Sequence, residues 1–126
     1  MKTQKTILWL EDEEDQTMLL VKTFEDNGYR TIVVDNAAKG MELLKRMTPD
    51  LLLVDIKLPG IDGLEFFKSV KEIDHLKNVP FVYLTAYNSI AMAMEAKRLG
   101  VADYITKPFE VEDLLQRIRA VLLTKE

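Results

Sequence analysis

Apolar residues gather along the chain in five short runs separated by longer amphipathic segments. The runs span residues 6–10, 30–34, 51–55, 81–85 and 102–106, and most of them are near-continuous rather than alternating. Continuous apolar runs of this length are typical of strands that are buried on both faces of a parallel sheet. The pattern therefore predicts five buried strands.

The segments between these runs have the apolar spacing and the boundary residues of helices. We expect helices over residues 14–27, from a cap at Asp35 or Asn36 to before Pro49, and over 63–72, 89–99 and 111–123. Gly28 and Gly100 follow two of these segments, where glycine commonly ends a helix. Strict alternation of strand and helix predicts a parallel sheet covered on both faces, with its ligand crevice beyond the carboxyl ends of the strands.

Composition narrows the class of protein. The 126 residues are 48% hydrophobic and 30% charged, which fits one compact domain. The net charge of -4 gives no global reason to bind nucleic acid or an anionic membrane. The absence of cysteine fits a reducing cytosol, and no segment approaches the ~20 apolar residues that span a bilayer. We therefore expect a soluble, cytoplasmic protein.

Polar residues stand at the ends of four of the predicted strands. Glu11 and Asp12 follow the first strand, Asp55 ends the third, Thr85 ends the fourth, and Lys107 follows the fifth. Their oxygens suit a hard divalent cation, and we expect Mg²⁺. Asp55 is the best placed nucleophile, since carboxylates can attack phosphorus, and a cation with the Lys107 ammonium would neutralise the charge.

Each of these residues also has an ordinary structural interpretation. Aspartate and threonine are common at strand ends as turn and cap residues, and a single lysine is usually a solvated surface group. Glu13, Glu14 and Asp15 are favourable in the first turn of a helix, at the positive end of its dipole. Only the joint placement of the strand-end residues favours chemistry.

Four motifs in this order closely resemble the receiver domain of bacterial two-component response regulators. They are LED at the end of the first strand, DLLLVDIKLPGIDG around Asp55, YLTA around Thr85, and DYITKPF around Lys107. The resemblance implies one receiver domain over 1–126 with a CheY-like, flavodoxin-like fold. That fold is a doubly wound α/β three-layer sandwich of five βα units, with a parallel sheet of order 2-1-3-4-5.

The resemblance also implies a role for each residue of the metal site. Glu11, Asp12 and Asp55, with the backbone carbonyl of Lys57, would hold Mg²⁺ or its substitute Mn²⁺. Asp55 would be the phosphoacceptor of a phosphorelay. Glu11 departs from the commoner aspartate of the family, and we expect the metal site to work with it.

Further roles follow for the other strand ends. By the resemblance, Thr85 is the switch hydroxyl, Lys107 the phosphate-binding lysine and Tyr104 the aromatic rotamer switch. Pro108 would follow a cis bond to Lys107. Such a domain is not an enzyme acting on other substrates, since it catalyses only its own phosphorylation and dephosphorylation.

The resemblance implies two kinds of partner, a donor of the phosphoryl group and an output protein or domain. The phosphoryl group would come from a sensor histidine kinase or a histidine phosphotransfer protein, which Gln16, Met18 and Leu19 could meet. The face formed by the fourth helix, the fifth strand and the fifth helix would control an output protein or domain, and phosphorylation could produce a homodimer. We expect no direct nucleic-acid binding and no membrane contact by this domain.

Lys57 and Tyr87 lie two residues beyond Asp55 and Thr85, at the mouth of the predicted site. Our hypothesis is that the long Lys57 and the bulky Tyr87 shield the acyl phosphate from water and prolong its lifetime. Phosphate loss measured before and after Lys57→Asn with Tyr87→Ala tests this, and an unchanged rate would refute it.

Other classes of protein remain as alternatives. A flavodoxin-type module needs a loop after the first strand that cradles phosphate, whereas this chain has five consecutive acids there. A Mg²⁺-dependent aspartyl-phosphate phosphatase and a non-phosphorylated pseudo-receiver are the other two candidates. The sequence leaves open whether the domain stands alone or belongs to a larger protein.

Overall fold

The computed structural model describes residues 4–56, 62–86 and 89–124, and for 14–16 it describes the backbone alone. The predicted site-mouth residues Lys57 and Tyr87 lie outside the described residues.

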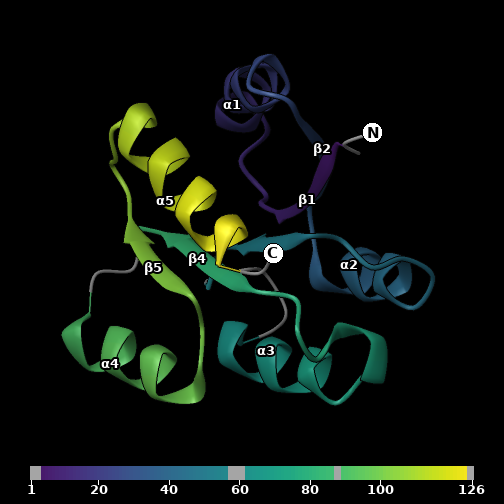
Figure 1. Cartoon of the computed structure of the whole chain (residues 1–126). Coiled ribbons are helices and arrows are strands. Elements are labelled where there is room, and N and C mark those ends of the chain that lie inside the picture. The colour runs from purple at the N-terminus through teal and green to yellow at the C-terminus, as the bar shows by residue number, and fades with distance from the viewer. Residues whose placement is uncertain (1–3, 57–61, 87–88, 125–126) are drawn as a thin grey trace.

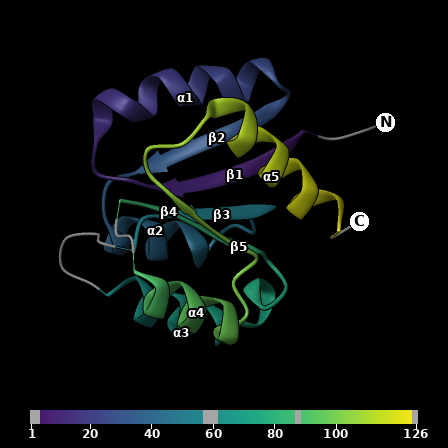
Figure 2. The same ribbon diagram turned by 90° about the vertical axis from the view of Figure 1, so that its left-hand side faces the viewer.

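A parallel sheet of five strands forms the middle layer of the molecule, in the predicted order β2-β1-β3-β4-β5. Its strands are β1 (Lys5–Leu10), β2 (Tyr29–Val34), β3 (Leu51–Val54), β4 (Phe81–Thr85) and β5 (Asp103–Thr106). The helices are α1 (Glu14–Asp26), α2 (Ala37–Leu44), α3 (Gly63–Lys71), α4 (Ile90–Leu99) and α5 (Val111–Leu123), with a short 3-10 turn η1 (Asp74–Leu76). Figures 1 and 2 show α1 and α5 on one face of the sheet and α2, α3 and α4 on the other. The predicted three-layer α/β sandwich is therefore confirmed.

Successive side chains of each strand point to opposite faces of the sheet, so the core consists of two clusters. Ile7 and Trp9 of β1 pack in the cluster under α1 and α5, while Leu8 and Leu10 pack in the cluster under α2, α3 and α4. All four side chains are buried, as the near-continuous apolar run predicts. Each such side chain contributes roughly 1.5–3 kcal/mol on burial, so the two clusters hold the strand ends in place.

Polar caps set the starts of three helices. The side chain of Asn36 accepts a hydrogen bond from the Lys39 amide at the start of α2, and Ser89 does the same for Met92 in α4. Asp62 caps α3 through the Leu64 amide. These side chains satisfy amides that have no partner within the helix, which explains why the helices begin there.

The first helix divides its apolar residues between the core and the surface. Phe24 is fully buried against Trp9, but Met18 and Leu19 are 74% and 77% exposed. A helix can bury only one stripe, so these two neighbours remain available for contact with another molecule. No helix in the described ranges has the length and apolar character that a membrane crossing requires.

Candidate functional site

Two buried carboxylates meet where the central strands end. The β1–β3 ladder pairs Leu10 with Val54, so the residues that follow them, Glu11 and Asp55, come side by side. The Asp55 amide donates to the Leu10 carbonyl at 3.1 Å, which extends this pairing by one step. Glu11 is 2% exposed and Asp55 is 7% exposed, whereas Asp12 is exposed to solvent. Oxygen atoms of the three carboxylates all lie within 4.8 Å of one another.

Lys107 brings a positive charge to this cluster from the end of β5. Its amide donates to the Thr85 carbonyl at 2.8 Å, which fixes the backbone beside β4. Its Nζ lies 2.7 Å from Glu11 Oε1, 3.6 Å from Asp55 Oδ2 and 3.8 Å from Glu13 Oε1. The peptide bond between Lys107 and Pro108 is cis. The Lys107 ammonium is therefore hydrogen-bonded to Glu11 and lies next to Asp55, the predicted phosphoacceptor.

Burial and the opposing charges shift the pKa values of this pair. Burial raises the pKa of Glu11, and the hydrogen bond and charge of Lys107 offset that effect only in part. Burial lowers the pKa of Lys107, but its bond to Glu11 and its attraction to the neighbouring carboxylates outweigh this, so the pKa is raised. Lys107 therefore keeps its proton, and Glu11 sits where a further positive charge would be favourable.

The donor set fits a divalent cation. Glu11 Oε2 is buried and has no hydrogen-bond partner among the described residues, although its sister oxygen is bonded to Lys107. An unsatisfied carboxylate oxygen in the interior is costly unless a cation or donor reaches it. Three carboxylates with no sulfur ligand suit a hard ion such as Mg²⁺, which takes oxygen ligands and keeps several waters.

The two predicted switch residues lie on neighbouring strands. Thr85 ends β4, is fully buried, and pairs with Thr106 of β5 in the ladder. Tyr104 pairs with Tyr83 in the same ladder, is partly buried, and its ring centroid lies 6.2 Å from that of Tyr83. Since Thr85 and Lys107 share a backbone hydrogen bond, the structure brings the predicted hydroxyl and ammonium to one edge of the sheet.

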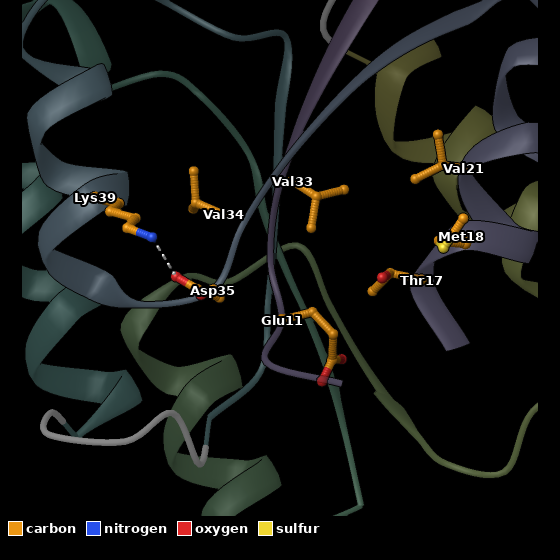
Figure 3. A pocket seen from close by; sticks show the side chains of 8 residues that line it. All are labelled: Glu11, Thr17, Met18, Val21, Val33, Val34, Asp35 and Lys39. Carbon is orange, nitrogen blue, oxygen red and sulfur yellow. Dashed lines mark ion pairs between the residues drawn. The ribbon is translucent and has the colours of Figure 1, made fainter. Parts of the chain in front are cut away.

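A cavity of about 610 Å³ opens beside the acid cluster, between α1 and the end of β2 (Figure 3). Glu11 lines it together with apolar side chains of α1 and β2, and an ion pair joins Lys39 Nζ to Asp35 Oδ1 at 3.1 Å. The hydrogen bond and charge of Lys39 lower the pKa of Asp35. We did not single out from the sequence this ion pair, which is a local contact between residues four apart, or the contact of Lys107 with Glu13, which depends on tertiary packing.

A family model for the response regulator receiver domain matches residues 7–119, which include every strand end described above. The chain belongs to the response regulator receiver domain family. The resemblance of its four motifs to this family is thereby confirmed, and the family is a signalling domain of two-component systems.

Several proteins are similar in sequence to this receiver domain. It is 33% identical to the sporulation initiation phosphotransferase F of Bacillus subtilis over 94% of each chain. It is 38% identical to the uncharacterized transcriptional regulatory protein YkoG of the same organism, but it spans only 50% of that protein's length. Some relatives therefore carry sequence outside the region that matches this domain.

Solved structures agree on the fold. The chemotaxis response regulator CheY4 of Vibrio cholerae superposes with a TM-score of 0.87 at 25% identity, covering 94% of this chain and 99% of that one. The receiver domain of the sensor histidine kinase PA1611 from Pseudomonas aeruginosa superposes with a TM-score of 0.82 at 25% identity, covering 96% and 98%. That structure has a magnesium ion coordinated in its active site cleft.

Proposed function

We propose that this receiver domain takes a phosphoryl group onto Asp55 in a Mg²⁺-dependent reaction and changes one of its faces in response. The observation that carries the proposal is the meeting of Asp55 with Glu11, Asp12 and the Lys107 ammonium at one edge of the sheet. The donor would be a phosphohistidine of a sensor histidine kinase or of a histidine phosphotransfer protein.

The transfer itself follows from the position of Asp55. A carboxylate oxygen of Asp55 attacks the phosphorus, the P–N bond to the donor histidine breaks, and the imidazole nitrogen leaves with the electron pair. Catalysis of phosphoryl transfer consists mainly of positioning and charge neutralisation. Lys107, with Nζ 3.6 Å from Asp55 Oδ2, is placed to bind a phosphoryl oxygen.

Glu11, Asp12 and Asp55 would hold the cation, and the unsatisfied Oε2 of Glu11 supports this assignment. The backbone carbonyl of Lys57 would complete the protein ligands. When bound, Mg²⁺ would neutralise the carboxylates and the phosphoryl oxygens, and Mn²⁺ would serve in its place.

The response begins at Thr85. Its hydroxyl would bond the new phosphoryl group and move toward it, and the Tyr104 ring would turn into the vacated space. These two residues lie on adjacent strands, so the movement would reshape the face made of α4, β5 and α5. Ile90 and Met94 are 79% and 67% exposed one turn apart on α4, which supports contact with an output partner or a second copy of the chain.

The donor would approach from the side of α1. Met18 and Leu19 are exposed on the helix that begins next to the acid cluster, and apolar side chains in that place suit a helical partner. Residues 1–126 would act as one receiver domain, and its net charge of -4 supports protein rather than nucleic-acid partners.

Incubation with a small phosphodonor and Mg²⁺, followed by intact mass measurement, tests the proposal. We expect one added phosphoryl group in the wild type and none in Asp55→Ala. Asp113→Ala, which removes an exposed carboxylate from α5, serves as the matched control and should be phosphorylated like the wild type. Multiple turnover of phosphate esters would indicate a phosphatase, and an unmodified wild type would indicate a pseudo-receiver.

A further inference from the structure

Tyr83 is a fully buried tyrosine of β4 whose hydroxyl bonds the start of α3. Its hydroxyl donates to the Gly63 carbonyl at 2.6 Å, across twenty positions of the chain. Burial raises the pKa of Tyr83, and the charge of Asp62 and the neighbouring Tyr104 add to this effect, so the hydroxyl keeps its proton. The bond lies in a region without solvent to compete for it, and it therefore fixes the ring as well as the helix start.

Gly63 in turn is held against the residue that follows the phosphoacceptor. Its amide donates to the Ile56 carbonyl at 3.1 Å. A Cβ at position 63 would lie 2.6 Å from Ile56 Cα and 2.8 Å from its carbonyl oxygen, so only glycine permits this approach. Because Ile56 directly follows Asp55, the hydroxyl of Tyr83 is connected through two hydrogen bonds to the backbone of the phosphoacceptor.

The ring of Tyr83 contacts the ring of Tyr104, the predicted rotamer switch. Its centroid lies 6.2 Å from that of Tyr104 with the planes at 61°, and 6.4 Å from that of Phe81 at 64°. Edge-to-face contacts of this kind depend on the orientation of both rings. Tyr104 can therefore adopt only ring positions that are compatible with where the Gly63 carbonyl holds Tyr83.

We propose that Tyr83 is a positioning residue that couples the state of Asp55 to the ring of Tyr104, through its hydrogen bond to Gly63 and its ring contact. This inference rests on the proposed function, because it assumes that Asp55 is phosphorylated and that Tyr104 responds. Besides the connection through Thr85, Asp55 and Tyr104 would then have a second one, which runs through the first turn of α3 and the strand β4.

The two connections differ in what they need. Thr85 would act through its own bond to the phosphoryl group, whereas Tyr83 needs no contact with that group. A change in the backbone at Asp55 and Ile56 is carried to Gly63 by the 3.1 Å bond, and from there to the Tyr83 ring by the 2.6 Å bond. Removal of the Tyr83 hydroxyl breaks this connection and leaves the ring, the core packing and the Thr85 hydroxyl in place.

Fluorine NMR of the full chain labelled with 3-fluorotyrosine tests the coupling. The chain has four tyrosines, and the Tyr104 signal is assigned from its loss in Tyr104→Phe. Beryllium trifluoride takes the place of a phosphoryl group on a carboxylate. Its addition together with Mg²⁺, both at saturating concentration, should shift the Tyr104 signal in the wild type. We expect Tyr83→Phe to reduce that shift at least twofold at saturation, and a full wild-type shift would overturn the inference.

Tyr29→Phe is the matched control, since Tyr29 is a buried tyrosine in the cluster on the opposite face of the sheet, and it should keep the full shift. If Tyr83→Phe does not fold, Tyr83→Met supplies an apolar side chain without a hydroxyl, with the same expected reduction. A wild type that gains a phosphoryl group on Asp55 without any shift of Tyr104 overturns the coupling and the proposed turn of the Tyr104 ring, and leaves Asp55 as the phosphoacceptor. A wild type that neither gains a phosphoryl group nor responds to beryllium trifluoride overturns the proposed function and the coupling together.

Discussion

Replacement of Asp12 by asparagine should stabilise the metal-free protein while it weakens binding of Mg²⁺. Two unit charges 4.8 Å apart repel by about 3.5 kcal/mol at an effective dielectric of 20, and Asp12 has two such neighbours in Glu11 and Asp55. Asp12 is exposed, so solvent and salt reduce the relief to about 1 kcal/mol in the free energy of unfolding. No ion pair between Asp12 and Lys107 offsets this gain in the described structure.

The same substitution removes one charged ligand from the proposed cation site. We expect the dissociation constant for Mg²⁺ to rise at least tenfold. At a Mg²⁺ concentration ten times its dissociation constant, the wild type gains about 1.4 kcal/mol of stability from the bound ion. The variant at that same concentration gains only about 0.4 kcal/mol. The two proteins should therefore be about equally stable at that Mg²⁺ concentration, and chelation should leave the variant more stable by about 1 kcal/mol.

Urea unfolding in EDTA and in Mg²⁺, followed by the fluorescence of the single tryptophan Trp9, measures both effects. Trp9 is buried in β1 two residues before Glu11, so its emission reports loss of the core next to the site. Glu25→Gln, which removes an exposed carboxylate at the far end of α1, controls for the change in net charge. An Asp12→Asn protein that is less stable in EDTA, or that binds Mg²⁺ like the wild type, would refute the reasoning.

Three further predictions concern other parts of the molecule. Lys107→Met leaves the Glu11 carboxylate buried without its 2.7 Å partner, so urea unfolding in EDTA should show a loss of about 3 kcal/mol, part of which Mg²⁺ restores. Met18→Ala with Leu19→Ala should slow phosphotransfer from a phosphohistidine protein about tenfold, because both exposed side chains would lie in that interface, while the rate with a small phosphodonor stays unchanged. The pKa of Tyr83 is raised above its ordinary 10.0, so the unfolded chain ionises first as the pH rises. Above pH 10 the unfolding free energy of the wild type should therefore fall faster than that of Tyr83→Phe, by up to about 1.4 kcal/mol per pH unit. Equal stabilities of Lys107→Met and the wild type in EDTA would contradict the first expectation. The second fails if the double alanine variant is also slower with the small phosphodonor, and the third fails if the unfolding free energies of Tyr83→Phe and the wild type fall in parallel above pH 10.

The features that the sequence predicted well are those that depend on strand register. Glu11 and Asp55 could be expected side by side because residues at the carboxyl ends of adjacent parallel strands meet at one edge. The span of α5 could be read from local spacing, and cap chemistry narrowed the start of α2 to Asp35 or Asn36, of which the structure has Asn36. Such features can be predicted without knowing how the side chains pack in the folded protein.

The features that the sequence did not predict depend on tertiary packing. Nothing in the order of residues indicates that Lys107 bonds Glu11 more closely than Asp55, since that choice follows from side-chain length and burial. The bond from Tyr83 to Gly63 joins two elements that only the packing of α3 on the sheet brings together. Helical spacing alone likewise leaves open whether Met18 lies in the core or at the surface.

Chemical localisation of the phosphoryl group tests the proposed function most directly. The wild type is incubated with a small phosphodonor and Mg²⁺, and borohydride then reduces the aspartyl phosphate to homoserine, which peptide mass spectrometry locates. We predict homoserine at position 55, none in samples prepared with EDTA, and none in Asp55→Asn. Homoserine at another carboxylate, or an unmodified position 55 in the Mg²⁺ sample, would contradict the assignment of Asp55 as the phosphoacceptor.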